Sequence, residues 1–263
     1  ENIPWRYNNV QDQTPCSCPA DRCRRSGYGR RSHVRTAPER CKQCCRSSPE
    51  LRQFQHGQTG AERLGQRRDG RADPVLLLLS QGNTAKTEQG VSYGAEAFTK
   101  QDGTDNSATS YQFAVNGSKS SLYQDGNLNE ATLSQTLSSG DRALVDQLGD
   151  RNMAEVVQTR SSGSVTEVEQ IGTANNADVY QAGRNQEAYA YSSGKYNTVN
   201  VDQRGSNQNG FVYQQGNLNK ATLDQRGNGN TATANQTGLD NAAVIDQDGR
   251  GQIAKVDQRG GYN

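Results

Sequence analysis

Cysteine and histidine are the residues of this sequence best suited to bind a metal ion or act as nucleophiles, and all of them lie near the N-terminus. The six cysteines, spaced C-x-C-x4-C-x17-C-x2-C-C, are Cys16, Cys18, Cys23, Cys41, Cys44 and Cys45. Thiolate pairs can hold a tetrahedral zinc ion, but this spacing lacks two C-x2-C knuckles. Disulfides or free thiols are the favoured interpretation, and zinc is the alternative. His33 and His56 have no carboxylate pattern nearby, so we expect them on the surface.

From residue 81 onward the sequence offers little for catalysis. Neither histidine nor cysteine occurs there, and the carboxylates recur as periodic surface residues. The G-G-x-G-x-D repeats of calcium-binding solenoids are missing as well. We therefore expect no enzymatic step, no metal site and no cofactor in this part of the chain.

The functional group that does recur is the carboxamide of glutamine. Glutamines follow one another in steps of 11 and 12 as far as residue 181 and in steps of 11 after it, with Ser192 at the one interrupted position. These glutamines are Gln89, Gln101, Gln112, Gln124, Gln135, Gln147, Gln158, Gln170, Gln181, Gln203, Gln214, Gln225, Gln236, Gln247 and Gln258. Buried amides need hydrogen-bond partners, and identical amides stacked in register can supply them to one another as a ladder.

The elements that would position these amides are short strands. Between Asn219 and Gln225 every second residue is Asn, Ala, Leu or Gln, and a strand points such residues to one side. An 11-residue period with this alternation leaves no helical stripe. The expected inward asparagines, which would join the glutamines in a structural and self-assembly ladder, are Asn106, Asn129, Asn152, Asn175, Asn197, Asn219, Asn230 and Asn241.

A glycine follows most of the glutamines and indicates a chain reversal, since glycine adopts positive φ at little steric cost. The expected turn glycines are Gly103, Gly126, Gly149, Gly172, Gly183, Gly194, Gly205, Gly216, Gly227, Gly238 and Gly249. In the first half of the repeats a second glycine type, such as Gly94, stands five residues after the glutamine. The sequence therefore predicts two kinds of arc and a 23-residue unit there, and a 22-residue unit from Gln181 onward.

Together these patterns predict an all-β chain. We expect a β-solenoid of about eight two-strand coils, of 22–23 residues each with parallel in-register stacking, over residues 81–263. Residues 1–80 read as a poorly structured Arg/Cys/Pro-rich segment, with 15 Lys and Arg against 8 Asp and Glu, whereas the rest has 14 against 20. Out-of-frame translation of repeat DNA is one hypothesis for this composition. Few aromatic residues accompany its arginines, so we expect no specific nucleic-acid recognition.

The termini and the one apolar run give further expectations. No signal peptide is visible at Glu1 and no initiator methionine, which suggests a processed form. The run Val75–Leu79 is too short to span a bilayer, so we expect a short buried strand or an irregular patch and no transmembrane segment.

At the C-terminal end, the last repeat, Gln258–Asn263, stops without a polar cap. Uncapped strand edges template further strands, so the pattern predicts end-to-end polymerisation.

The pattern Q-x-G-x-x-N-x-[AV]-x-x-x-Q, seen at Gln124–Gln135, resembles the curlin repeat of bacterial curli subunits. It recurs from Gln147, Gln170, Gln214, Gln225 and Gln236, and the resemblance covers about residues 81–263. It implies a secreted structural subunit of a β-solenoid amyloid fibre in the biofilm matrix of a Gram-negative bacterium. It also implies a homopolymer, a minor nucleating subunit and a dedicated outer-membrane secretion pore.

The sequence departs from the family pattern at several positions. Gln186, Gln208 and Gln252 replace the inward Asn, Gly210 replaces the Ala, and residues 1–80 do not match the family's short N-terminal segment. The alternative function is a monomeric surface-binding solenoid, either adhesive or ice-binding. Ice binding would need flat outward rows of threonine, which the sequence does not provide in a regular file.

Overall fold

The computed structural model describes residues 75–79 and 81–263, which form 17 β-strands and no helix. The predictions for the six cysteines, for His33 and His56, and for most of the N-terminal segment fall outside these residues. Odd-numbered strands form one sheet: β1 (Val75–Leu79), β3 (Glu96–Thr104), β5 (Lys119–Asn127), β7 (Arg142–Asp150), β9 (Val165–Thr173), β11 (Glu187–Lys195), β13 (Asn209–Asn217), β15 (Thr231–Leu239) and β17 (Ile253–Gly261). Even-numbered strands form the other: β2 (Thr84–Gly90), β4 (Ser107–Phe113), β6 (Glu130–Thr136), β8 (Met153–Thr159), β10 (Asn176–Arg184), β12 (Thr198–Ser206), β14 (Lys220–Asn228) and β16 (Ala242–Arg250).

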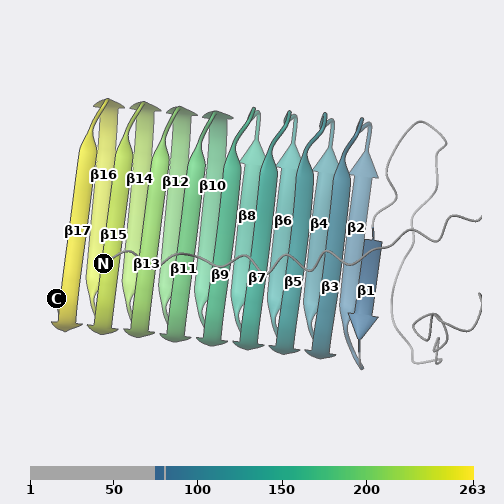
Figure 1. Cartoon of the computed structure of the whole chain (residues 1–263), viewed down its shortest axis with the longest axis horizontal. Coiled ribbons are helices and arrows are strands. Elements are labelled where there is room, and N and C mark those ends of the chain that lie inside the picture. Colours follow the sequence, from purple (N-terminus) through teal and green to yellow (C-terminus); the bar gives the residue numbers. More distant parts are fainter. Residues whose placement is uncertain (1–74, 80) are drawn as a thin grey trace, which may run out of the picture. The chain divides into compact units, whose positions relative to one another are not determined.

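The chain winds as a β-solenoid, placing each strand beside the strand two further along the sequence (Figure 1). All pairings are parallel and in register. The register step is 23 residues in the first half, as for Gln124 and Gln147, and 22 in the second, as for Gln203 and Gln225. The predicted fold class, with its two unit lengths and about eight coils, is confirmed.

The sheet begins earlier than the expected boundary at residue 81. Strand β1 lies within the segment assigned to irregular structure, and it pairs with β3 from Val75 opposite Phe98 to Leu79 opposite Asp102. Its step from β3 is the same as the step from β3 to β5, so the solenoid register continues into the apolar run. The residue in register with Gln101 is Leu78, so β1 lacks the glutamine of the repeat. The glutamine period therefore did not indicate this strand.

The core is the narrow space between the two sheets. Along the strands from β3 to β16 inward residues are buried and alternate with outward ones, and the buried ones are mainly Ala, Val and Leu in the middle with amides at the ends. Leu122, Leu133 and Leu223 are the largest fully buried apolar side chains. Small side chains suffice because the sheets lie close together, which explains how a chain with 31% hydrophobic residues can fold.

The chain crosses between the sheets at two edges, whose geometries differ in the first half of the solenoid and become alike in the second, where Asn185 and Asn207 are also left-handed. At the edge that leads into the even strands, the residue just before the inward Asn adopts a left-handed conformation although it is not glycine, as at Leu128 (φ 58°) and Leu218 (φ 60°). The turn glycines of this edge, from Gly103 to Gly238, stand two residues earlier, with φ between 102° and 129°. Each left-handed residue donates its backbone N–H to the preceding coil, as from Leu218 to the Lys195 carbonyl oxygen (2.9 Å), and this bond holds the strained turn.

Candidate functional site: the stacked amide columns

The recurring glutamines form two columns inside the solenoid, one along each sheet. In the even column, from Gln89 to Gln247, each Nε2 donates to the Oε1 of the glutamine in the next coil, at 2.7–3.0 Å. The odd column, from Gln101 to Gln258, is built in the same way apart from one interruption. All of these side chains are buried except those in the outermost coils, Gln89 and Gln258.

Each glutamine also joins the two sheets. The second N–H of Gln225 donates to the Asn209 carbonyl oxygen at 3.1 Å, and that of Gln236 donates to Lys220 at 2.9 Å. Within an unbroken stretch of a column, as at Gln225, each amide therefore has three partners: the glutamines above and below and a backbone carbonyl of the facing sheet. Because every link donates in the direction of the C-terminus, the columns have a polarity.

Ser192 interrupts the odd column. Its hydroxyl donates to Gln214 Oε1 at 3.3 Å, but Gln170 Nε2, one coil earlier, donates only to the Met153 carbonyl oxygen. The site is fully enclosed, with Ser192 1% exposed. The serine therefore removes one link of the ladder and shortens the side chain at this point.

We expect Ser192→Gln to stabilise the solenoid by about 1 kcal/mol, because it restores an amide hydrogen bond in a site already shaped for glutamine in the coils on either side. Urea unfolding measures the gain. Ser193→Gln, which changes the neighbouring outward residue of β11 in the same way, should leave the midpoint unchanged. An equal gain from both variants would show that the ladder is not its cause.

The asparagines form a further column at the edge that leads into the even strands. Each Oδ1 accepts the backbone N–H of the Asn in the next coil, as from Asn129 to Asn106 (2.9 Å), and Nδ2 donates to a glycine carbonyl, as from Asn129 to Gly149 (2.7 Å). This column contains Asn83, Asn106, Asn129, Asn152, Asn175, Asn197, Asn219, Asn241 and Asn263. Asn230 belongs instead to the opposite edge, where it precedes β15.

The opposite edge carries mixed polar residues and holds a buried carboxylate that the sequence analysis missed. Asp141 is 1% exposed and accepts hydrogen bonds from the Ser161 hydroxyl and from the Ser164 backbone N–H (2.8 Å). Its own N–H donates to Ser118 Oγ at 3.2 Å. Burial raises the pKa of the Asp141 carboxyl, although the hydrogen bonds from Ser161 and Ser164 oppose the shift. Asp141 stands one full repeat before Ser164, at an inward position of the repeat, and this position was the sequence signal that could have indicated its burial.

This raised pKa predicts a pH-dependent stability. The unfolded carboxyl ionises first as pH rises from about 4, which favours the unfolded chain until the folded-state pKa is passed. Asp141→Asn lacks this titration, so the unfolding free energy of the variant minus that of the parent should rise with pH through that window and stay constant above it. Unfolding free energies measured from pH 3 to 8 test this, and parallel pH profiles for the two proteins would contradict it.

The turn glycines of neighbouring coils stack against one another. A Cβ on Gly126 would overlap the carbonyl oxygen of Gly149, and the same relation holds from Gly149 to Gly172 and from Gly205 to Gly227. These glycines are therefore needed for close approach between coils as well as for their positive φ.

The outer faces carry charges and aromatic rings in columns. Asp202 and Asp224 stack in register, and each pairs at 2.7 Å with an arginine two residues on, Arg204 and Arg226. On the odd sheet the rings of Tyr191 and Tyr213 stack in parallel at 4.7 Å.

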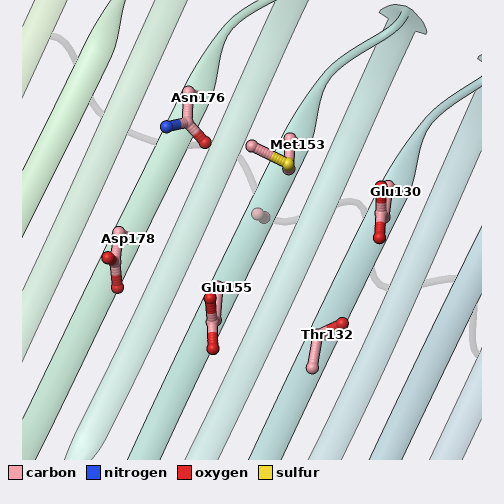
Figure 2. Close-up of a pocket in the computed structure, with 7 residues that line it drawn as sticks. Glu130, Thr132, Met153, Glu155, Asn176 and Asp178 are labelled. Atoms are coloured by element: carbon pink, nitrogen blue, oxygen red, sulfur yellow. The ribbon is translucent and has the colours of Figure 1, made fainter.

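A shallow hollow of about 160 Å³ lies on the outer face of β6, β8 and β10 (Figure 2). Its carboxylates, Glu130, Glu155 and Asp178, come from three successive strands. Burial raises the pKa of Asp178, and the charges of Glu155 and Asp202 add to the shift.

Within the described residues no group of three or more His, Cys, Asp and Glu side chains is arranged to hold a metal ion. The same part of the chain has no helix of the length and apolarity that a membrane span requires.

Comparison with known protein families agrees with this geometry. The family model of the curlin associated repeat matches three overlapping stretches, residues 172–205, 194–227 and 219–249. These stretches lie in the second half of the solenoid, where the repeat unit has 22 residues and the arcs at both edges are short. A comparison with curated proteins gave no match. Residues 172–249 of this chain thus match the curlin repeat family.

Proposed function

We propose that this chain is a secreted structural subunit that stacks end to end with further copies into a curli-like amyloid fibre. The fibre would serve adhesion and aggregation in the extracellular biofilm matrix, at the surface of a Gram-negative bacterium. A minor nucleating subunit and a dedicated outer-membrane pore are part of the same proposal, and they rest on the curlin repeats.

The observation that best supports assembly is the state of the C-terminal coil. Ala254 and Val256 of β17 are only partly buried, whereas the matching Ala232 and Ala234 of β15 are fully buried. Gln258 donates to the Ala242 carbonyl oxygen but has no glutamine beyond it within the described residues. A further coil of another copy would bury this apolar face and extend both amide columns.

The direct test is incubation of the purified full-length chain at neutral pH. We expect a lag phase followed by unbranched fibres whose diffraction has the strand spacing of about 4.8 Å along the fibre axis. Protein that stays monomeric at high concentration, with its β-structure intact, would favour the monomeric surface-binding solenoid instead.

Ice binding receives no support from the outer faces. Thr132 and Thr222 share one column on the even sheet, but Glu155, Asp178 and Asn200 stand between them. The column is therefore neither flat nor uniform in hydrogen bonding.

A further inference from the structure

The edge that leads into the even strands carries one left-handed residue in each coil, directly before the inward asparagine. In Figure 1 this edge lies at the arrowheads of the odd strands. Its left-handed residues, which we call the edge column, are Asp105, Leu128, Arg151, Ala174, Tyr196, Leu218, Asp240 and Tyr262. Backbone hydrogen bonds join successive arcs, as from the Arg151 N–H to the Asn127 carbonyl oxygen at 2.9 Å. Neighbouring members of the column therefore lie one strand spacing apart, about 4.8 Å.

The residue types of the edge column are unusual for its backbone. A left-handed conformation is unfavourable for most L-residues, and glycine, asparagine and aspartate adopt it most readily. At the opposite edge the second half of the solenoid uses such residues, as at Asn207 and Gly229. The edge column of the same coils has Tyr196 and Leu218 instead, whose side chains are 58% and 50% exposed. Large apolar side chains held exposed on a strained backbone indicate a contact with another molecule.

The order of residues along the edge column is self-complementary about Tyr196. Ala174 and Leu218 stand one coil away on either side, and both are apolar. Arg151 and Asp240 stand two coils away on either side, and their charges are opposite. Beside a second copy whose axis runs the other way, Tyr196 would meet its own counterpart and Ala174 would meet Leu218. The same two-fold arrangement would bring Arg151 of each copy opposite Asp240 of the other, which gives two ion pairs.

The two charges are available for this contact. Within the part of the chain that the structure describes, neither Arg151 nor Asp240 takes part in an ion pair. The carboxylate of Asp150, next to Arg151, accepts from Asn127 Nδ2 at 2.9 Å. Two copies with parallel axes would place each charge opposite its own counterpart, so electrostatics favours the antiparallel pair. Lys195 would lie near its counterpart in either arrangement, but its side chain is exposed and can turn the ammonium group to water.

From these observations we propose that the edge column is a lateral docking surface for a second copy of this chain, which binds antiparallel about a two-fold axis at Tyr196. The pairing goes beyond the proposed end-to-end assembly, because it uses the side of the solenoid and not its ends. In a fibre it would join two files of subunits that run in opposite directions. The contacts of one subunit are few, but they recur in every subunit along the fibre and so add up. The fibre is therefore two solenoids wide.

An exchange of charges tests the pairing and its direction. Arg151→Asp and Asp240→Arg should each give fibres one solenoid wide, because each places like charges opposite one another. The double variant restores opposite charges and should give fibres two solenoids wide, like the parent. Mass per length from electron microscopy measures the difference, which is twofold. Arg160→Asp, the same change at an exposed left-handed residue of the opposite edge, is the matched control and should leave the mass per length unchanged.

The failure of the pairing and the failure of the proposed function give different results. Parent fibres one solenoid wide would overturn the pairing and leave the function intact, and so would a double variant as narrow as the single ones. If the parent forms no fibres, the proposed function fails and sedimentation of the soluble chain decides the pairing. A reversible dimer that both single variants lose and the double variant regains supports it. A monomer at all concentrations overturns it.

Discussion

Gly149→Ala is expected to destabilise the solenoid by about 3 kcal/mol or more and to abolish fibre growth at subunit concentrations where the parent assembles. Gly149 has φ 117°, a region that L-residues rarely adopt, and a Cβ there would overlap the carbonyl oxygen of Gly172 in the next coil. Relief would require the coils to separate, which would break in-register backbone and amide hydrogen bonds on both sides. Chemical denaturation of the variant measures the loss.

Gly140→Ala is the matched control. Gly140 also has positive φ, 67°, but it lies in one of the long arcs, and a Cβ there would meet nothing within 4 Å. Its expected cost is only the left-handed backbone strain, about 1 kcal/mol. Equal destabilisation of the two variants would show that contact between coils does not set the requirement for glycine at position 149.

The sequence was sufficient to predict the solenoid because the repeat period and the alternation of residues within each repeat determine the strands and their stacking. Alternation of Asn, Ala, Leu and Gln over Asn219–Gln225 predicted which side chains point inward, and the structure buries all four. The shift of glycine from five residues after Gln89 to two after Gln101 predicted two arc types and the change from the longer to the shorter repeat unit. Parallel in-register stacking followed because only that arrangement superposes identical residues.

Features that depend on contacts between coils were not predictable. A short strand at Val75–Leu79 was one of two expectations, but this run has no glutamine or glycine at the repeat positions, so only the pairing with β3 places it in the solenoid. The left-handed residue at Leu218 was unexpected, because a leucine there is strained; its backbone N–H donates to the Lys195 carbonyl oxygen of the preceding coil. Asp141 looks like a surface residue in the sequence, and its burial depends on serines 20 and 23 residues further along the chain.

The asparagine ladder shows the same limit. Its position was visible in the period, but its chemistry was not. Asn129 Oδ1 accepts the backbone N–H of Asn152, and Asn129 Nδ2 donates to the Gly149 carbonyl oxygen. From Asn175 onward each asparagine Nδ2 also donates to the Asn Oδ1 of the preceding coil, at 2.8–3.2 Å. The asparagines therefore join coils through their side chains, as the glutamines do, and also bind the backbone of the arcs.

Gln225→Leu is expected to cost about 3 kcal/mol of unfolding free energy and to slow fibre growth markedly. The substitution keeps the volume of the buried side chain but removes its amide. Gln203 Nε2 loses an acceptor at 2.9 Å, Gln247 Oε1 loses a donor at 2.9 Å, and the Asn209 carbonyl oxygen loses a cross-sheet bond. Each buried polar group left without a partner costs about 1–3 kcal/mol, and the added apolar surface offsets only part of this.

Lys220→Ala in the same strand is the control for Gln225→Leu, because Lys220 points outward and is exposed. It should change stability by less than about 0.5 kcal/mol and leave the growth rate close to that of the parent. Denaturation midpoints and growth kinetics of the two variants, measured side by side, separate inward from outward positions. Equal growth rates would contradict the role of the glutamine column in assembly. If the column continues from one copy to the next, the loss of one buried glutamine should slow fibre growth.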